Sequence, residues 1–541
     1  MSNITFNRKQ FEKDIGKLDE KMQNKISLFG TSLEKFDETE MEIEVYPNRP
    51  DLLSYQGFKR SFLAFLGKKP GLKEYKIHKP EKDFVVTIDN SVKDVRPYTV
   101  CSIIKGLKFD NEKIKEIIDI QEKLHLTIGR KRKKIAIGIY PLEKIKLPII
   151  FKALEPDKIK FIPLESDREM TGLQILQKHP KGREFASLLT GKSKFPIFVD
   201  ADNNILSMPP IINSQATGKI TNETKNIFVE CSGFDLNSLN KCLNIITSCL
   251  AEMGGEIYQM ELHEKNSKKL SPDFTPEKTK INLEHANSLL GLKLTEKEIK
   301  KFLEEMGHNY NKGLVEVAPW RTDILHEVDL IEDIAIAYGY ENFIPEIPSI
   351  TTTGKEDRKH IIKRKISEII CGLNFLEISN YHLTNKQDQF KKMIIPEDDF
   401  IEVKESKTDY TILRKDLTHY LLKILSENVD AEYPQRIFEI GRIFSPKETE
   451  NLALAITPSN FTEARQIIEY LSRMINLKIE ITEPEKCPNY FIEGRTIELK
   501  IENKSIGYLG EIHPKILKNW RIKMPVSIFE INLEEIFKKL E

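Results

Sequence analysis

The sequence lacks the paired cysteines that would mark a zinc site or a disulfide framework. No two cysteines form a Cys-x-x-Cys pair, and no histidines stand at zinc-finger spacing. A structural zinc site is therefore not expected. The N-terminal stretch MSNITFNRKQFEKD has no apolar core of a secretory leader, which predicts free thiols in a reducing cytoplasm. The six cysteines stand at positions 101, 231, 242, 249, 371 and 487.

An excess of either charge is also missing. The 83 Lys and Arg residues are balanced by 83 Asp and Glu residues, so no basic field covers the whole protein. This balance excludes a nucleic-acid binder held by overall charge, and any RNA contact must be local or supplied by a partner. No uninterrupted run of about 18 or more apolar residues occurs. The predicted location is cytoplasmic, with no membrane partner.

The composition that remains is typical of a folded chain with several domains. It contains 40% hydrophobic and 31% charged residues. At 541 residues the chain is too long for one core and is expected to form three or four domains. The predicted boundaries give domains at residues 1–83, 84–268, 269–347 and 348–541.

Periodic patterns predict several helices and strands. Thr295 and Glu298 form a capping box at the start of a helix that Gly307 ends. The turn at residues 200–204 is typical of a β-hairpin. Other predicted helices cover residues 51–66, 111–124, 236–253 and 356–371, and predicted strands cover residues 41–45, 314–318, 377–383 and 436–444.

The segment WRTDILHEVDLIEDIAIAYGY at residues 320–340 carries the most chemical information. It predicts a helix that ends at Gly339. Asp329, Glu332 and Asp333 are spaced i, i+3 and i+4, which places them on one helical face. An apolar stripe is expected to bury the opposite face: Ile324, Val328, Ile331, Ala335 and Tyr338.

Crowded carboxylates allow two interpretations. They form either a solvated acidic face or a shared site for a hard cation such as Mg2+. Asp323 lies about 240° around an ideal helix from Asp329, so it joins such a site only from the start of the helix. The residues alone leave both interpretations open.

A second candidate lies in the stretch MPPIINSQATGKI. Pro209 and Pro210 are expected to confine their strand to a sheet edge. Asn213, Ser214 and Thr217 then follow the strand and present hydrogen-bonding groups to a cleft. Such residues are more common in turns than in catalysis, so spacing alone assigns them no role.

Three stretches together resemble one known family, the beta subunit of phenylalanyl-tRNA synthetase. VEVAPWRTDILHEVDLIEDIAIAYGYENFIPEIP resembles its paired-strand and helix module. MEIEVYPNRPDLLSYQGFKRSFLAFLG resembles its N-terminal strand, Asn-Arg-Pro-Asp turn and helix, and MPPIINSQATGKI resembles its Pro-Pro-Ile-Ile-Asn-Ser motif. The resemblance covers nearly the whole chain in the expected order and is to the short archaeal and eukaryotic form.

The resemblance implies partners and a cofactor. An alpha subunit is expected to carry the synthetic site for ATP-dependent attachment of phenylalanine to tRNA(Phe), within an alpha2beta2 heterotetramer. Mg2+ is expected close to that subunit, bound by a carboxylate quartet. The positions that match the quartet are Asp323, Asp329, Glu332 and Asp333.

The resemblance also implies that residues 84–268 form an editing domain, which hydrolyses tyrosine wrongly attached to tRNA(Phe). An apolar pocket rejects one added hydroxyl by only about 100-fold, so a second, hydrolytic site is chemically reasonable. Asn213, Ser214 and Glu230 are the candidate editing residues, expected to orient the ester, the tyrosine hydroxyl or a water. No Ser/His/Asp nucleophile arrangement is present in the pattern.

The last domain resembles the antiparallel core of class II aminoacyl-tRNA synthetases. Arg414 and the strand RIFEIGRIF resemble its second motif, in which an arginine holds ATP phosphate, but no third motif follows residue 490. The core is therefore expected to be catalytically inactive and to serve as a scaffold. The inserted OB-fold and the C-terminal anticodon-binding domain of bacterial members have no counterpart in this sequence.

The predicted fold class is thus α+β and multidomain, combining this core with an editing domain and small helix and strand modules. The predicted function is that of a synthetase beta subunit that supplies a scaffold, a Mg2+ site and editing. One alternative is a non-catalytic RNA-associated scaffold with a silent pocket. Another is an independent deacylase that needs no partner.

Overall fold

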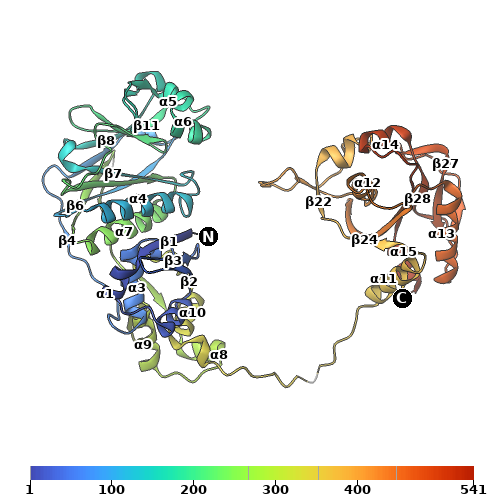
Figure 1. Cartoon of the computed structure of the whole chain (residues 1–541), viewed down its shortest axis with the longest axis horizontal. Helices are drawn as coiled ribbons and strands as arrows, with labels where there is room; N and C mark the ends of the chain where they lie inside the picture. Colours follow the sequence, from blue (N-terminus) through green and yellow to red (C-terminus); the bar gives the residue numbers. More distant parts are fainter. Residues whose placement is uncertain (1, 266, 351, 446, 541) are drawn as a thin grey trace. The chain divides into compact units, whose positions relative to one another are not determined.

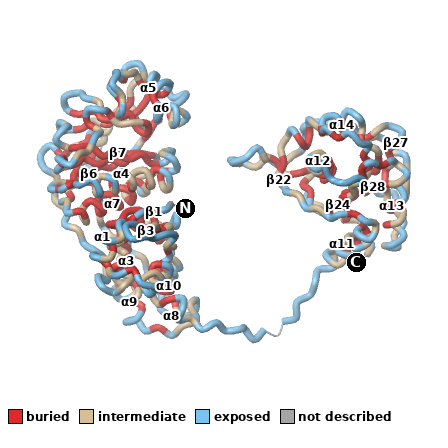
Figure 2. The backbone as a smooth tube through the Cα atoms, in the orientation of Figure 1, coloured by how far each residue is buried: buried red, intermediate tan, exposed pale blue. Residues whose placement is uncertain are grey.

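The chain divides between Glu346 and Ile347 into two units, each described here by itself. The structure is a computed structural model that describes residues 2–265, 267–350, 352–445 and 447–540 (Figure 1). In both units the buried residues follow the sheets and the inner faces of the helices (Figure 2). Within these ranges, no helix is both long enough and apolar enough to cross a membrane.

The first unit begins with a small sheet covered by helices. Three strands pair in the order β1-β3-β2. Phe11, Phe58 and Phe62 are fully buried between this sheet and its helices. The elements are β1 (Ser2–Asn7), α1 (Arg8–Asp14), α2 (Glu20–Leu28), β2 (Ser32–Phe36), β3 (Glu40–Val45) and α3 (Tyr55–Phe65).

The start of α3 differs from the prediction of a helix over residues 51–66. Pro50–Leu52 forms a separate 3₁₀ turn, and the α-helix begins at Tyr55. Ser54 is its N-cap because the Ser54 hydroxyl accepts a hydrogen bond from Gly57 N at 3.0 Å. Asp51 is not available to the helix terminus, since its carboxylate pairs with Arg49 Nε and Nη2, both at 2.9 Å. Arg49 is thus a buried structural residue.

Two sheets form the middle of the first unit. One is five-stranded, in the order β4-β15-β6-β14-β7, and the other is seven-stranded, in the order β13-β12-β11-β8-β5-β16-β17. Their strands are β4 (Ile77–His78), β5 (Val85–Ile88), β6 (Tyr98–Lys105), β7 (Ile135–Pro141), β8 (Ile149–Leu154), β11 (Phe195–Val199), β12 (Ile205–Met208), β13 (Ile212–Asn213), β14 (Ile227–Gly233), β15 (Glu256–Tyr258), β16 (Met260–Glu264) and β17 (Ser267–Ser271). The short strands β9 (Lys160–Phe161) and β10 (Met170–Thr171) pair beside α5 (Gly172–Lys178) and α6 (Pro180–Phe185).

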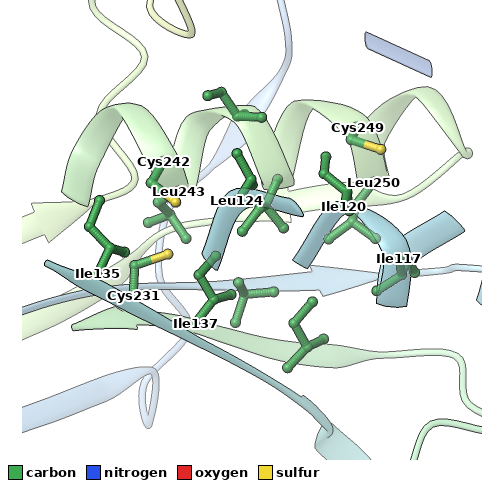
Figure 3. Close-up of a cluster of buried hydrophobic side chains, with 14 of the residues drawn as sticks. Ile117, Ile120, Leu124, Ile135, Ile137, Cys231, Cys242, Leu243, Cys249 and Leu250 are labelled. Carbon is green, nitrogen blue, oxygen red and sulfur yellow. The ribbon is translucent and has the colours of Figure 1, made fainter. Parts of the chain in front are cut away.

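Helices α4 (Asn111–Leu126) and α7 (Leu236–Glu252) cover the five-stranded sheet. Figure 3 shows side chains of both helices meeting those of β7 and β14. Leu124 of α4 and Leu243 of α7 are fully buried in this layer. Both helices match their predictions within two residues at each end, because a strong apolar stripe of helical period fixes them.

The prolines of MPPIINS stand in a different place from the one predicted. Pro209 and Pro210 form the turn between β12 and β13, and their peptide bond is cis. The edge of the seven-stranded sheet is therefore β13, which contains Asn213, and β12 is an inner strand. The predicted hairpin at residues 200–204 is confirmed, with the Asp200 carboxylate accepting a hydrogen bond from Asn204 N at 2.8 Å.

A helix and strand module completes the first unit. Its three-stranded sheet has the order β18-β20-β19, and Thr295 with Glu298 forms the predicted capping box. Its elements are β18 (Glu277–Lys280), α8 (Leu283–Leu290), α9 (Glu296–Glu305), β19 (Asn309–Asn311), β20 (Leu314–Val317) and α10 (Glu327–Tyr338). One continuous hydrophobic core runs from Ile4 to Trp320, so the first three predicted segments pack as one unit.

The second unit is built on a seven-stranded sheet with the order β21-β24-β25-β29-β28-β27-β26. All its strand pairs are antiparallel except β21 with β24. The predicted strand over residues 377–383 is instead two short strands, β21 and β22. The elements are α11 (Arg358–Cys371), β21 (Leu376–Glu377), β22 (Leu383–Thr384), β23 (Ile412–Leu413), α12 (Thr418–Glu427), β24 (Gln435–Ser445), β25 (Lys447–Thr457), α13 (Phe461–Met474), β26 (Glu480–Thr482), β27 (Phe491–Ile501), β28 (Lys504–Ile512), α14 (Pro514–Trp520), β29 (Ser527–Asn532) and α15 (Glu534–Leu540).

Candidate functional site

A cavity of about 830 Å³ lies between helix α4, the edge strand β7 and the turn that joins β12 to β13. Asn213 and Glu230, two of the three predicted editing residues, line it. Most of its apolar wall consists of isoleucines, which suits an aromatic or aliphatic side chain. These are Ile114, Ile117, Ile118, Ile137, Ile139, Ile211, Ile212 and Ile220.

The inner end of the cavity is organised around the hydroxyl of Tyr140. This hydroxyl lies 2.7 Å from Ser207 Oγ, 3.3 Å from Glu230 Oε1 and 3.4 Å from Asn213 Oδ1. Ser207 and Asn213 face each other across β12 and β13. Tyr140 and Glu230 come from β7 and β14 of the other sheet. The cluster therefore joins the two sheets at the cavity.

Glu230 is a buried carboxyl that is protonated at neutral pH. Burial raises its pKa to about 8, although the charge of Arg96 acts in the opposite direction. Its Oε2 atom has no hydrogen-bond partner among the described residues. A protonated carboxyl donates one hydrogen bond and still accepts others. Glu230 can therefore recognise a neutral polar group, such as a hydroxyl.

Two glycines make the room that this end of the cavity needs. Gly138 faces Glu230 across β7 and β14, and a Cβ at Gly138 would lie 2.2 Å from the Tyr140 hydroxyl and 2.6 Å from Glu230 Oε1. Gly218 packs beneath Asn213, where a Cβ would come within 2.7 Å of the Asn213 Cβ. A side chain at either position would displace the polar cluster.

Ser214, the third predicted editing residue, is not brought together with the other two. Ser214 lies just after β13 and is not among the residues that line the cavity, whereas Asn213 and its neighbour Ile212 both are. It lines a separate depression with Lys152 and Phe161. Its backbone carbonyl accepts a hydrogen bond from Gly218 N at 2.8 Å, which fixes the turn after Asn213.

The outer end of the cavity carries a second polar cluster, which the sequence pattern did not reveal. Glu122 Oε1 accepts a hydrogen bond from Arg132 Nη2 at 2.8 Å and lies 3.4 Å from His125 Nδ1. The hydrogen bond from His125, with the charge of Arg132, lowers the pKa of Glu122 to about 2. Burial lowers the pKa of His125, which keeps its ring neutral. Glu122 is therefore ionised, whereas Glu230 is not.

The acidic helix α10 places its carboxylates differently from the prediction. Asp333 points into the protein, where Asp333 Oδ1 accepts a hydrogen bond from Arg321 Nη2 at 3.0 Å and Oδ2 lies 2.9 Å from His308 Nε2. Asp323 takes two hydrogen bonds from Arg321, from Nε at 2.8 Å and from Nη2 at 2.7 Å. The guanidinium of Arg321 thus supplies the positive charge between these two carboxylates.

The other two predicted ligands lie outside this ion pair. Asp329 Oδ2 accepts hydrogen bonds from the backbone nitrogens of Leu325 and His326, both at 2.7 Å, and so caps the helix. Glu332 is exposed and, with Asp329, lines an open depression of about 370 Å³. Within the described ranges, no group of three or more His, Cys, Asp or Glu side chains is arranged to hold a metal ion. The predicted quartet does not form one cation site within this chain.

The predicted single acidic face of α10 is therefore wrong in one respect. The buried stripe of the helix includes Asp333 together with Leu330, Ile331 and Ile334, whereas Val328 is 49% exposed. The physical reason is that Arg321 and His308 compensate a buried carboxylate at position 333. Helical spacing alone contains no information about those two partners.

Arg414 in the second unit has a structural role. It is 1% exposed, and its Nη1 donates to Glu439 Oε1 at 2.6 Å while its Nε donates to the carbonyl of Arg442 at 2.7 Å. A Cβ at Gly441 would lie 2.4 Å from Arg414 Nη2, so glycine makes room for the guanidinium. The charge of Arg414 is neutralised within the fold and is not presented to a phosphate.

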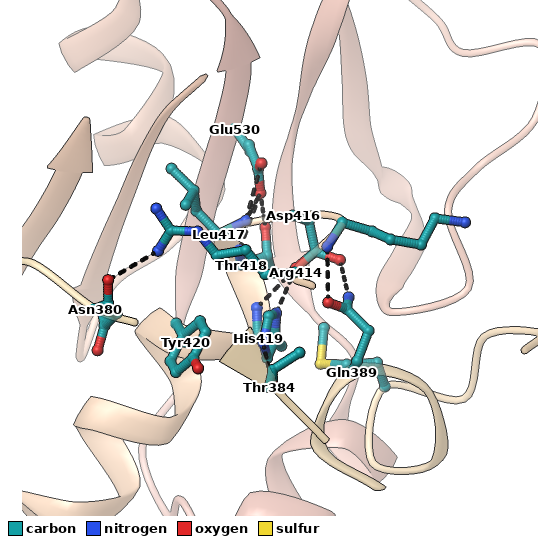
Figure 4. A network of polar contacts seen from close by, with 12 residues as sticks. Asn380, Thr384, Gln389, Arg414, Asp416, Leu417, Thr418, His419, Tyr420 and Glu530 are labelled. Carbon is teal, nitrogen blue, oxygen red and sulfur yellow. Dashed lines mark hydrogen bonds and ion pairs between the residues drawn. The ribbon is translucent and has the colours of Figure 1, made fainter. Parts of the chain in front are cut away.

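A buried acidic network adjoins Arg414 (Figure 4). Glu530 accepts hydrogen bonds from the backbone nitrogens of Leu417 and Thr418, at 3.0 and 2.9 Å. Asp416 lies 2.9 Å from His419 Nδ1. Burial, followed by the charge of Asp416, raises the pKa of Glu530 to about 7. Two neighbouring acids make this region unfavourable for a triphosphate.

Several polar residues of these two sites were not singled out by the sequence analysis. Arg321 stands two positions before Asp323, and this nearby countercharge could have indicated an ion pair. Glu122 and Arg132 gave no such indication, because their contact depends on how α4 packs against the loop before β7. Tyr140 reads in the sequence as an ordinary strand residue.

Comparisons with known proteins identify relatives along the whole chain. Three domain families match: the phenylalanyl tRNA synthetase beta chain CLM domain at residues 344–533, the tRNA synthetase B5 domain at 279–340 and the B3/4 domain at 105–247. The phenylalanine–tRNA ligase beta subunit of Thermococcus sibiricus is 40% identical over 506 residues, covering 91% of this chain and 90% of the relative. That of Archaeoglobus fulgidus is 37% identical over 548 residues, covering 99% of each.

A solved structure is also similar. The crystal structure of an N-terminal fragment of the phenylalanyl-tRNA synthetase beta subunit from Pyrococcus horikoshii matches with a TM-score of 0.59 and 36% identity. The match covers 62% of this chain and 99% of the fragment.

Proposed function

The chain belongs to the family of phenylalanine–tRNA ligase beta subunits, which are components of aminoacyl-tRNA synthetases, and from this premise we propose how it divides its work with a partner. An alpha subunit carries ATP-dependent activation of phenylalanine and its transfer to tRNA(Phe) in an alpha2beta2 assembly. This chain supplies a scaffold and the hydrolytic editing of Tyr-tRNA(Phe), and it acts in the cytoplasm.

The observation that carries the editing proposal is the cavity with Tyr140, Asn213 and a protonated Glu230 at its inner end. Its isoleucine wall accepts the aromatic ring of a misattached tyrosine. Glu230, which lines this end of the cavity, then recognises the phenolic hydroxyl, which phenylalanine lacks. A site that hydrogen-bonds a substrate hydroxyl rejects the analogue without it by far more than an apolar pocket can, because the polar group is otherwise left unpaired.

The reaction is ester hydrolysis. The oxygen of a water bonds to the carbonyl carbon of the aminoacyl ester, the bond from that carbon to the ribose oxygen breaks, and a proton from water ends on the ribose hydroxyl. Asn213 lies beside Glu230 at the Tyr140 hydroxyl, so it is proposed to orient the tyrosine hydroxyl through its half-buried amide. Ser214 is proposed to act through its backbone, which fixes the turn that carries Asn213.

The second unit is proposed to be a class II synthetase-like core that has lost its own chemistry. Two observations support this proposal: the sheet is antiparallel except for one pair of strands, and the Arg414 guanidinium is neutralised by Glu439. A buried arginine whose charge is already paired with a carboxylate stabilises the fold and is a weaker ligand for ATP phosphate. The unit then serves as a rigid surface for assembly.

Mg2+ is proposed as a cofactor of the assembled enzyme. The carboxylates of this chain that remain available to it are Glu332 and Asp329, because Arg321 already neutralises Asp323 and Asp333. Mg2+ takes hard oxygen ligands and keeps several waters, so one or two carboxylates from this chain are sufficient when a partner supplies others. The ion would lend charge neutralisation at the subunit contact.

Two measurements test the proposed function. Phenylalanylation of tRNA(Phe) is expected only when this chain is mixed with its alpha partner, and charging by the chain alone would refute the scaffold role. Hydrolysis of Tyr-tRNA(Phe) is expected from the assembly and is expected to be lost in Asn213→Ala. If wild-type assembly leaves Tyr-tRNA(Phe) intact, the chain is a scaffold with a silent pocket. If the isolated chain is a monomer with full editing activity, it is an independent deacylase.

A further inference from the structure

The cavity has two chemically different ends, and only the inner one is used by the proposed editing roles. The inner carboxyl, Glu230, is protonated at neutral pH, whereas the outer carboxyl, Glu122, is ionised. A neutral carboxyl suits a hydroxyl group, and an ionised carboxylate suits a cation. An aminoacyl ester carries one cation, its α-ammonium group.

We propose that Glu122 binds the α-ammonium group of the aminoacyl ester and so restricts the cavity to esters with a free amino group. This inference rests on the proposed editing function. It gives the outer end of the cavity a role in binding, which the editing roles of Glu230 and Asn213 do not explain.

Glu122 is held in place but keeps one oxygen free. Its Oε1 is occupied by Arg132 Nη2 at 2.8 Å, with His125 Nδ1 at 3.4 Å. No hydrogen bond to its Oε2 occurs among the described residues, and the side chain is 46% exposed. A carboxylate has about four lone-pair sites, so the remaining oxygen can accept a ligand. Arg132 pairs with Oε1, so a cation bound at Oε2 lies nearer to the carboxylate than to the guanidinium, and Coulomb attraction is strongest at the shorter distance.

Arg132 is anchored as a positioning residue. Its Nη1 donates to the carbonyl of Ile211 at 2.9 Å, which ties Glu122 to the turn that precedes Asn213. Its guanidinium carbon lies 4.5 Å from the centre of the Phe185 ring, and the side chain is 12% exposed. The Arg132 side chain therefore connects Glu122 at the outer end to the turn before Asn213 at the inner end.

The backbone that carries Arg132 is strained. Arg130, Lys131 and Arg132 have φ values of 48°, 53° and 64°, in the left-handed region that side chains with a Cβ rarely adopt. Strain of this kind persists where the surrounding structure holds it, and it clusters at functional sites. Here its result is the placement of Arg132 against Glu122.

Hydrogen bonds between helix α4 and strand β7 also fix the position of Glu122. Gln121 Nε2 donates to the carbonyl of Ile137 and His125 Nε2 accepts from the nitrogen of Ile137, both at 2.8 Å. These two bonds fix the last turns of α4 against the edge strand β7. Glu122 lies between them in sequence, so its position relative to Tyr140 on β7 is set by the same contacts.

The test compares two esters of the same tRNA on the complete assembly, without ATP or phenylalanine. One ester carries tyrosine and the other carries 3-(4-hydroxyphenyl)propanoic acid, which has the same phenol but no amino group. Glu122→Gln keeps the size of the side chain and removes its charge. Glu112→Gln is the matched control, because Glu112 stands on the same helix α4, is exposed and is not among the residues that line the cavity.

Glu122→Gln is expected to lower kcat/KM for Tyr-tRNA(Phe) by about tenfold to hundredfold, the value of a charge-assisted hydrogen bond. The ester without an amino group is expected to change by no more than about twofold, as is either ester with Glu112→Gln. An equal loss on both esters would mean that Glu122 acts only by holding Arg132, and no loss on either would remove it from recognition. Both outcomes overturn the inference while editing stands. If the wild-type assembly hydrolyses neither ester, the editing function fails and the inference fails with it.

Discussion

Replacing Arg321 by methionine is expected to destabilise the first unit strongly. Arg321 and Asp333 form a buried ion pair, with side chains 2% and 4% exposed. Methionine replaces the aliphatic stem of the arginine side chain but leaves the carboxylates of Asp333 and Asp323 without the guanidinium countercharge. Removing one partner of a buried pair costs about 3 to 5 kcal/mol, because the other charge stays buried and uncompensated. The free energy of unfolding of a domain is typically about 5 to 15 kcal/mol, so this cost is a large part of it.

The two tryptophans of the chain make this loss measurable. Trp320 lies in the first unit and Trp520 in the second, and both are buried. In a Trp520→Phe background, urea unfolding followed by fluorescence reports on the first unit. With a slope of about 3 kcal/mol per M, the midpoint for Arg321→Met is expected to fall by about 1 to 1.7 M. Arg8→Met, which removes a partly exposed pair with Glu12, is the control and is expected to cost less than about 1 kcal/mol.

The pH dependence of stability provides a second test of the Arg321 and Asp333 ion pair. Burial would raise the pKa of Asp333, but the charge of Arg321 and the hydrogen bond from His308 outweigh it and hold that pKa well below its usual range. A carboxylate with a lowered pKa stabilises the fold above its unfolded pKa, about 4, and loses this contribution as pH falls further. The gap between wild type and Arg321→Met is therefore expected to narrow below about pH 4. Equal urea midpoints at pH 7 would refute the reasoning.

Three further outcomes are expected. Hydrolysis of Tyr-tRNA(Phe) falls as pH rises through about 8, where Glu230 loses its proton, and Glu230→Gln removes this fall in a pH-rate profile. Arg414→Met lowers the urea midpoint of the second unit by about 1 M or more, since it leaves Glu439 buried and unpaired, but leaves the KM for ATP of the assembly unchanged. Asp329→Ala with Glu332→Ala weakens assembly with the alpha partner and lowers bound Mg2+, and unchanged yield and metal content would contradict it.

The Asp329 and Glu332 experiment also separates two effects on the first unit. Asp329 caps α10, so its loss alone costs about 1 kcal/mol of stability whether or not a metal binds. Glu332 is exposed and makes no such contact among the described residues. Glu332→Ala by itself should therefore leave the unfolding midpoint unchanged, and any loss of assembly in this single variant reports on the partner contact.

Local sequence patterns determined most of the helices, because their information is contained in a few neighbouring residues. The apolar period and the Asp235 cap set α7, and Thr295 with Glu298 set the start of α9. Where two caps compete, the pattern is less decisive. Asp51 and Ser54 both suit a helix start, and only the buried pairing of Asp51 with Arg49 gives the role to Ser54.

The candidate editing site was only partly accessible to sequence reasoning. Asn213 and Glu230 stand 17 positions apart in the sequence, yet they meet because β13 and β14 belong to different sheets that Tyr140 joins. Ser214 shares the motif with Asn213 but stands just after β13 and lines a different depression. A motif therefore marks the location of the site but does not state which of its residues face the cavity.

What the sequence by itself determined is the family, the order of most elements and the position of the acidic helix. What only the tertiary structure decided is the charge state and partner of each polar side chain. Asp333 is neutralised by Arg321, Glu122 is ionised by Arg132 and His125, and Glu230 is kept protonated by burial. The physical reason is that hydrogen bonds and desolvation depend on atoms a few ångströms away in space, which the chain brings together only when it folds.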